Sequence, residues 1–186
     1  KVNIFNFITG VLADLEDGLN KKDIHVSFLK SNEEVNINID KTYFSKCLIN
    51  ILDNAIKHSP KHGTITVDIK SFDSNLLIRI KDQGVGFHKK FDINNIQPFD
   101  LIEHFDQNVG LGLYLSNLIV NAHGGTIENG NNKTGGAFIK ISIPIWNELI
   151  SNYISNIPFY YLLIRQTTSM NYKITISTNK REGLYD

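Results

Sequence analysis

The chain has 186 residues, enough for one domain or for one domain with an appendage. Its 19 Lys and Arg residues balance 19 Asp and Glu residues, so it lacks the strong single-sign field that gathers nucleic acid or an anionic membrane. The single Cys47 excludes an internal disulfide, and no apolar run approaches the ~20 residues that span a bilayer. We therefore expect a cytoplasmic piece without membrane insertion of its own, which leaves open a membrane-anchored parent chain.

The first third of the chain predicts two helices and two strands. Apolar residues recur every three or four positions over residues 4–20, as on an amphipathic helix. Residues 25–29 and 35–39 alternate apolar and polar around a polar turn, which predicts a hairpin. Asp40 is a suitable N-cap for a second helix, whose apolar stripe runs over residues 44–56.

The remaining pattern is richer in strands. Alternating segments predict four of them, at residues 64–72, 76–81, 126–128 and 137–143. Residues 82–108 contain glycines and a proline without a sustained period, which indicates a long loop, and loops of this length are usually functional or disordered. A third helix is predicted over residues 114–121, directly after a glycine-containing segment.

This order of elements predicts an α+β fold. We expect a two-layer α/β sandwich, with helices on one face of a mixed, mostly antiparallel sheet. Residues 1–144 form one predicted domain. Residues 145–186 lie beyond it as a C-terminal extension, for which the sequence allows either a further hairpin or a tail.

The second predicted helix places three polar side chains on one face. Asn50, Asn54 and Lys57 are separated by four and three positions, so they share one side of the helix. An Asn amide oxygen is a hard neutral ligand for Mg²⁺, and a Lys one turn further on reaches phosphate as a point charge. By itself, the same pattern also fits an ordinary solvated helix face.

A second element follows the strand at residues 76–81. Asp82 stands at the strand end, and Gly84 and Gly86 allow close approach of a flat ligand. An Asp carboxylate in this position can accept a hydrogen bond from the exocyclic amine of a base such as adenine. The alternative is a tight turn capped by Asp.

The third element opens the last predicted helix. The residues are Gly110, Leu111, Gly112 and Leu113. Glycines at a helix start expose backbone N–H groups, and the positive end of the helix dipole favours phosphate there. Glycine-rich helix starts are common, so the argument rests on the conjunction of three elements in this order, with a long loop between the second and the third.

Taken together, these motifs resemble the catalytic ATP-binding domain of sensor histidine kinases. Residues 50–58 are similar to the N box, residues 82–86 to the G1 box and residues 110–115 to the G2 box. Residues 96–99 resemble the F box in the lid. The last strands of the family's domain are similar to residues 123–127 and 135–144. The resemblance therefore spans about residues 1–144.

The resemblance implies a Bergerat-type fold with a mobile ATP lid, and ATP and Mg²⁺ as cofactors. Asn54 is implied to coordinate Mg²⁺ with help from Asn50, Lys57 to contact phosphate and Asp82 to bind the adenine amine. His58 stands at a position where the family usually has Tyr or Phe beside the nucleotide, and it is implied to stack there in their place. The nucleotide-binding set also includes Gly84, Gly86, Gly110, Leu111, Gly112 and Leu113.

One position separates this family from related ATPases. Gyrase, mismatch-repair and heat-shock chaperone ATPases resemble one another in having a Glu general base at the first N-box position, where this chain has Asn50. Phosphoryl transfer is therefore expected rather than efficient hydrolysis. None of the six histidines stands in the sequence context of a phosphoacceptor helix. The implied partners are thus a phosphoacceptor and dimerisation domain outside this sequence and a downstream response regulator, without nucleic acid.

The chain departs from the family pattern at three places. Asn108 occupies a position where the G2 box usually has Gly, and Ala137 a position where many relatives have Thr. Residues 92–109 contain no Lys or Arg that would contact the γ-phosphate from the lid. Two alternatives remain: a degenerate nucleotide-binding or docking module without kinase activity, which these departures favour, and an ATP-hydrolysing clamp, which Asn50 disfavours.

Overall fold

A computed structural model of the chain describes residues 1–30, 35–96 and 110–145. Its main feature is a five-stranded sheet in the order β2-β4-β5-β7-β6. The strands are β2 (His25–Lys30), β4 (Thr64–Phe72), β5 (Asn75–Lys81), β6 (Thr126–Asn131) and β7 (Ala137–Pro144). Strand β2 pairs in parallel with β4, and all other pairs are antiparallel.

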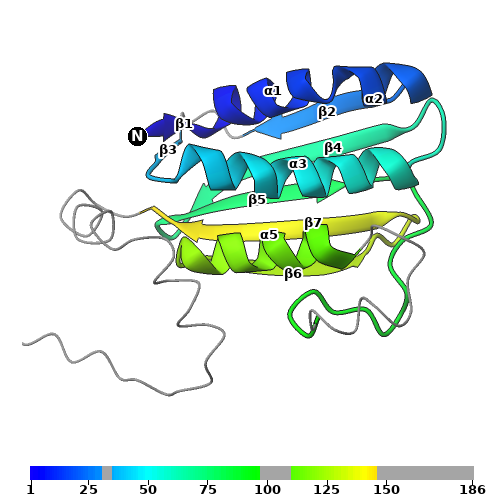
Figure 1. Ribbon diagram of the computed structural model, residues 1–186. Helices are drawn as coiled ribbons and strands as arrows, with labels where there is room; N and C mark the ends of the chain where they lie inside the picture. The colour runs from blue at the N-terminus through cyan, green and yellow to red at the C-terminus, as the bar shows by residue number, and fades with distance from the viewer. Residues whose placement is uncertain (31–34, 97–109, 146–186) are drawn as a thin grey trace, which may run out of the picture.

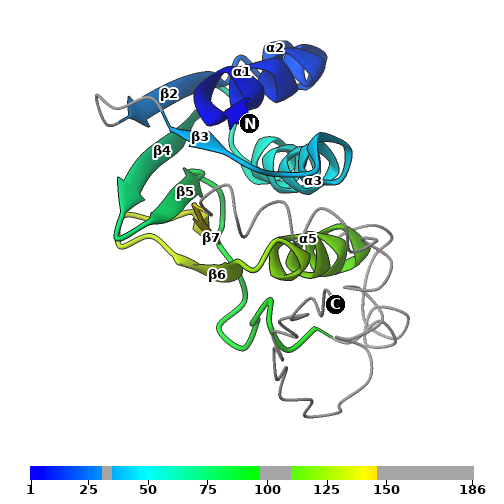
Figure 2. The same cartoon turned by 90° about the vertical axis from the view of Figure 1, so that its left-hand side faces the viewer.

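The helices lie on one face of this sheet (Figure 1). They are α1 (Ile4–Asp14), α2 (Glu16–Lys22), α3 (Lys41–His58) and α5 (Gly110–Ala122). Figure 2, which looks along the layers, shows the helices on one side and the strands on the other. The predicted two-layer α+β fold is confirmed. Within the described residues, no helix combines the length and the apolar character needed to cross a membrane.

The core lies between the buried face of the sheet and the buried sides of the helices. Alternate residues of the central strands point toward the helices and are buried, as Ile65, Val67 and Ile69 are on β4. Helix α3 supplies a buried stripe at helical spacing. Its members are Phe44, Cys47, Leu48, Ile51, Leu52, Ala55 and Ile56. This helix begins where predicted, because Asp40 Oδ1 accepts the backbone N–H groups of Thr42 at 2.9 Å and Tyr43 at 3.1 Å.

The predicted hairpin of residues 25–29 and 35–39 is wrong. Strand β2 pairs with β4, and β3 (Asn36–Ile37) pairs with β1 (Val2–Asn3) in a separate two-stranded sheet. Alternation predicts that a segment is a strand, but it does not name the partner strand. Here α3 forms the crossover that brings β4 beside β2 in parallel.

Two helix predictions change in their bounds. The apolar stripe over residues 4–20 is divided between α1 and α2, which meet at Leu15. The last helix begins at Gly110 rather than after the glycines, so Gly112 lies inside its first turn. The extension at residues 146–186 and most of the F box, residues 97–99, lie outside the described residues, as does Asn108. The domain boundary at residue 144 remains a prediction.

Helix α2 holds the C-terminal end of α3 through one lysine. Lys22 Nζ donates to the carbonyl oxygens of Ile56, Lys57 and Ser59 at 3.0, 2.6 and 2.9 Å. These carbonyls belong to the end of α3, where the helix dipole is negative and carbonyl groups lack helical partners. All three ammonium hydrogens therefore satisfy groups that the helix itself leaves open.

We expect Lys22→Met to lower the free energy of unfolding by about 1–3 kcal/mol, because it keeps the aliphatic stem but removes the donors to these carbonyl groups. Urea denaturation at neutral pH measures the change. Lys21→Met, at the exposed neighbouring position, is the matched control and should have little effect. Equal stabilities of the two variants would contradict a capping role for Lys22.

Helix α5 is joined to α3 by buried contacts. Cys47 is fully buried, its thiol lies 3.8 Å from the carbonyl oxygen of Ser116, and burial raises the pKa of this thiol to about 12. The prediction of a buried cysteine is confirmed.

His123, which follows α5, contacts the start of α3. Its Nε2 accepts the backbone N–H of Asp40 at 3.0 Å, while its Nδ1 lies 2.7 Å from the carbonyl oxygen of Ile119. A carbonyl can only accept, so His123 is neutral with its proton on Nδ1.

This arrangement predicts a loss of stability on acidification. Burial lowers the pKa of His123 below its ordinary value of 6.5, against the opposing effects of the Ile119 carbonyl and the Asp40 charge. The unfolded chain takes up a proton near pH 6.5 and the folded chain does not, so the contribution of His123 is present above that pH and is lost as the pH falls. Between about pH 7.5 and about pH 5.5, the urea midpoint should fall further for the wild type than for His123→Leu. Parallel curves would contradict this prediction.

Candidate functional site

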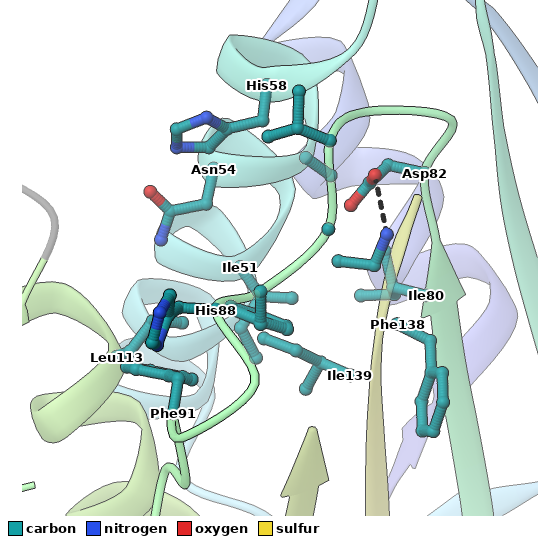
Figure 3. Close-up of a pocket in the computed structure, with 15 residues that line it drawn as sticks. Ile51, Asn54, His58, Ile80, Asp82, His88, Phe91, Leu113, Phe138 and Ile139 are labelled. Carbon is teal, nitrogen blue, oxygen red and sulfur yellow. Dashed lines mark hydrogen bonds between the residues drawn. The ribbon is translucent and has the colours of Figure 1, made fainter. Parts of the chain in front are cut away.

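A cavity of about 210 Å³ lies between the sheet and the helices, at the end of α3 (Figure 3). Four structural elements line it: α3, the end of β5 with the loop that follows, the start of α5, and β7. The lining residues are Ile51, Asn54, Ala55, His58, Ile80, Asp82, Val85, Gly86, Phe87, His88, Phe91, Leu113, Ala137, Phe138 and Ile139. Five residues that the sequence predicted for the site are among them: Asn54, His58, Asp82, Gly86 and Leu113.

Helix α3 presents one face to this cavity. Ile51, Asn54, Ala55 and His58 follow the spacing of one helix side. The first and third are buried, whereas His58 is exposed and Asn54 is partly exposed. Figure 3 shows the Asn54 and His58 side chains next to each other on α3. The Asn54 amide forms no hydrogen bond with any described residue, so its oxygen can bind an external partner.

Asp82 faces α3 from the end of β5. Its Oδ1 accepts two backbone N–H groups, from Gly84 at 2.8 Å and from Ala137 at 2.9 Å. Figure 3 shows the second of these bonds as a dashed line. These bonds fix the carboxylate at the junction of β5, β7 and the following loop. Within the described part of the chain, no hydrogen bond engages Oδ2, which leaves one carboxylate oxygen to accept a donor from a ligand.

Two glycines allow the turn after Asp82. A Cβ atom on Gly84 would lie 2.5 Å from the carbonyl oxygen of His58, so only glycine lets this turn approach the end of α3. Gly86 has φ +82°, in the left-handed region that side chains disfavour. The tight-turn interpretation of this segment is therefore correct as geometry, and the turn also forms a wall of the cavity.

The loop beyond Gly86 adds an aromatic wall. The Phe87 and Phe91 rings are stacked with centroids 4.8 Å apart and planes 9° apart. His88 also lines the cavity. None of these three residues was predicted for the site, because residues 82–108 have no sustained period and these three lie between the motifs at residues 82–86 and 96–99. Two aromatic residues four positions apart were the available signal.

Several predicted site residues lie outside the lining. Asn50 Nδ2 donates to the carbonyl oxygen of Gly112 at 3.2 Å and joins α3 to α5. Lys57 and Leu111 are exposed. Gly84, Gly110 and Gly112 shape the turn and the start of α5 and are not part of the cavity lining. Of the three polar residues that were predicted to share one face of α3, only Asn54 lines the cavity.

The donor set suits a magnesium ion that arrives with a ligand. The described residues contain no group of three or more His, Cys, Asp or Glu side chains that would hold a resident metal ion. Mg²⁺ commonly takes one or two protein oxygens and completes its shell with phosphate oxygens and waters. The uncommitted amide of Asn54 fits that requirement.

The fold and the cavity have the arrangement expected of an ATP-binding domain of the kinase and ATPase class. A carboxylate fixed at a strand end faces an asparagine on the covering helix, and a helix that starts with glycines closes the same cavity. A family model described as "Histidine kinase-, DNA gyrase B-, and HSP90-like ATPase" matches residues 39–147. The chain belongs to this family and carries a histidine kinase ATP-binding catalytic domain, as its motifs predicted.

Curated relatives and solved structures agree with this assignment. Sensor histidine kinase SpaK of Bacillus subtilis is 29% identical over 151 residues, which are 80% of this chain and 33% of SpaK. Sensor histidine kinase WalK of Bacillus subtilis (strain 168) is 31% identical over 138 residues, 68% of this chain and 22% of WalK. The catalytic domain of histidine kinase ThkA superposes with a TM-score of 0.68 at 23% identity, covering 77% of this chain and 94% of that domain. The chain therefore spans a third or less of the two curated relatives.

Proposed function

We propose that this domain binds Mg-ATP and transfers its γ-phosphoryl group to a histidine on a dimerisation and phosphoacceptor domain outside this sequence. The reaction serves two-component signalling, with a response regulator downstream. One observation carries the proposal: Asn54 of α3 and Asp82 at the end of β5 line the same cavity, together with apolar residues such as Ile51 and Ile80. The cytoplasm is the compartment that fits this reaction.

Asp82 selects the base. The two backbone N–H groups on Oδ1 hold the carboxylate still, and Oδ2 accepts a hydrogen bond from the exocyclic amine of adenine. A hydrogen bond to a charged group contributes about 1.5–3 kcal/mol. Guanine presents a carbonyl oxygen at that position, which the carboxylate repels. Gly86 and the Phe87–Phe91 stack give a flat base room and an apolar surface.

The phosphates lie toward α5 and the exposed edge of α3. Helix α5 begins at Gly110, and its first N–H groups favour a phosphate. Asn54 supplies the amide oxygen for the metal, Asn50 supports it one turn earlier, and Lys57 brings its exposed ammonium to the phosphate oxygens. A bound Mg²⁺ neutralises phosphate charge during transfer.

The amide at position 50 favours transfer over hydrolysis. Asn50 has no basic oxygen with which to deprotonate water, and its Nδ2 is bonded to Gly112. Asp53, the nearest carboxylate in sequence, is exposed and does not line the cavity. The acceptor for the phosphoryl group must therefore be a nucleophile supplied by another domain.

A transfer assay tests the proposal. The purified chain is mixed with γ-labelled ATP, Mg²⁺ and a separately prepared dimer of the phosphoacceptor domain from its own system. The expected product is an acid-labile, alkali-stable label on the histidine of that domain. Failure to label its genuine partner, with nucleotide bound, would refute the kinase function and leave the docking module. Steady release of phosphate without the acceptor would instead identify an ATPase.

A further inference from the structure

Two asparagines of β6 bind the backbone of the loop that forms the aromatic wall. Asn131 Oδ1 accepts the N–H of Phe87 at 2.6 Å, and its Nδ2 donates to the carbonyl oxygen of the same residue at 2.9 Å. Asn129 Oδ1 accepts the N–H of Ile93 at 2.8 Å, and its Nδ2 donates to the carbonyl oxygen of Phe91 at 3.1 Å. Each amide thus satisfies one donor and one acceptor of the loop.

The position of these asparagines explains why they reach the loop. Residues two apart on a strand point to the same face, so Asn129 and Asn131 project together from β6. Strand β6 is an edge of the sheet and pairs only with β7. Figure 2 shows the described part of the loop after β5 passing beside β6 on the side away from the other strands. The loop is therefore bound to this edge strand through side-chain amides.

The bonded segment carries residues of the cavity. Phe87, His88 and Phe91 line it, and all three lie between the first and the last backbone group that the asparagines bind. Ile93 is fully buried, and its carbonyl oxygen accepts Asn117 Nδ2 of α5 at 3.0 Å. The segment of residues 87–93 is therefore fixed at both ends while its aromatic side chains face the cavity.

We propose that Asn129 and Asn131 are positioning residues that hold the base-facing wall of the nucleotide cavity in its binding arrangement. This role rests on the proposed function. Neither residue lines the cavity, so they act through the loop backbone. When a site is only partly populated in its competent form, the apparent dissociation constant rises in inverse proportion to that population. Loss of the asparagine bonds should thus weaken binding of the nucleotide and raise its KM, with kcat of phosphoryl transfer unchanged.

Isosteric variants test this inference. Asn131→Asp and Asn129→Asp keep the oxygen that accepts the loop N–H, but they place a second oxygen against the loop carbonyl where the wild type has a donor. ADP titration by calorimetry should show a dissociation constant raised about tenfold by each substitution. Asn36→Asp, on β3 and outside the cavity lining, is the matched control and should bind ADP like the wild type.

A second measurement does not depend on how the variants fold. In the nucleotide-free wild type, the amide hydrogens of Phe87 and Ile93 should exchange slowly with solvent, although they lie in a loop. Fast exchange at both would overturn the inference, as would equal ADP binding by both Asp variants and the wild type. Absence of ADP binding by the wild type would instead overturn the proposed function and with it this role.

Discussion

Asp82→Asn is expected to raise the dissociation constant for ADP by about 10- to 100-fold, the loss expected when a hydrogen bond to a charged acceptor is removed. The amide oxygen of asparagine can take the place of Oδ1 toward Gly84 and Ala137, so the turn keeps its shape. The amide nitrogen then takes the place of Oδ2. It presents hydrogens to the adenine amine, which is also a donor.

The same substitution should change the preference between bases. Guanine offers an acceptor where adenine offers a donor, so the ratio of GDP to ADP affinity should rise in the variant. Calorimetric titration with both nucleotides measures this ratio. Asp53→Asn is the matched control, because it removes an exposed carboxylate of α3 that does not line the cavity. Unchanged affinity for both nucleotides would remove Asp82 from base recognition.

Asn54→Ala is expected to reduce the rate of phosphoryl transfer by about 100-fold or more, the effect of removing a group that stabilises charge in a transition state. Asn54 lines the cavity, and its amide oxygen has no partner within the described chain that would hold it away from a metal ion. Binding of ADP without Mg²⁺ should be much less affected, because the adenine side of the cavity stays intact.

A magnesium titration separates this role from a general loss of binding. In the wild type, Mg²⁺ should strengthen ADP binding, and in Asn54→Ala this gain should be lost. If the variant keeps the full gain, another group holds the metal and Asn54 has no part in it. Rates are measured with the phosphoacceptor domain in excess, so that transfer and not encounter limits the signal.

Local signals predicted the main parts of this fold well. The Asp40 cap and the apolar stripe of α3 were sufficient to place that helix, and alternation placed β4, β5 and β7. These features depend on residues close in sequence, which a linear pattern shows. Pairing between strands depends on long-range contacts, and for that reason the parallel partner of β2 was missed.

The site shows the same difference between features set by residues close in sequence and features set by long-range contacts. Asp82 and Asn54 were predicted from short motifs, and both line one cavity. Lys57 shares a helix face with Asn54 in a linear pattern, yet it is exposed and lies outside the lining, because the side of α3 that lines the cavity carries Ile51, Ala55 and His58 as well as Asn54. The spacing of Phe87 and Phe91 was a local signal for a contact, but it could not place their stack at the cavity, because that position depends on hydrogen bonds from β6, more than thirty residues further along the chain.

Asn50 donates to the carbonyl oxygen of Gly112 and, as an amide, provides no base that could activate water. On the proposed function, an enzyme without a base beside the terminal phosphate hydrolyses its bound ATP only slowly. The rate of phosphoryl transfer is then set by how often the phosphoacceptor domain reaches the ATP-bound domain. The amount of phosphorylated acceptor therefore depends on encounters between the two domains and not on the lifetime of bound ATP.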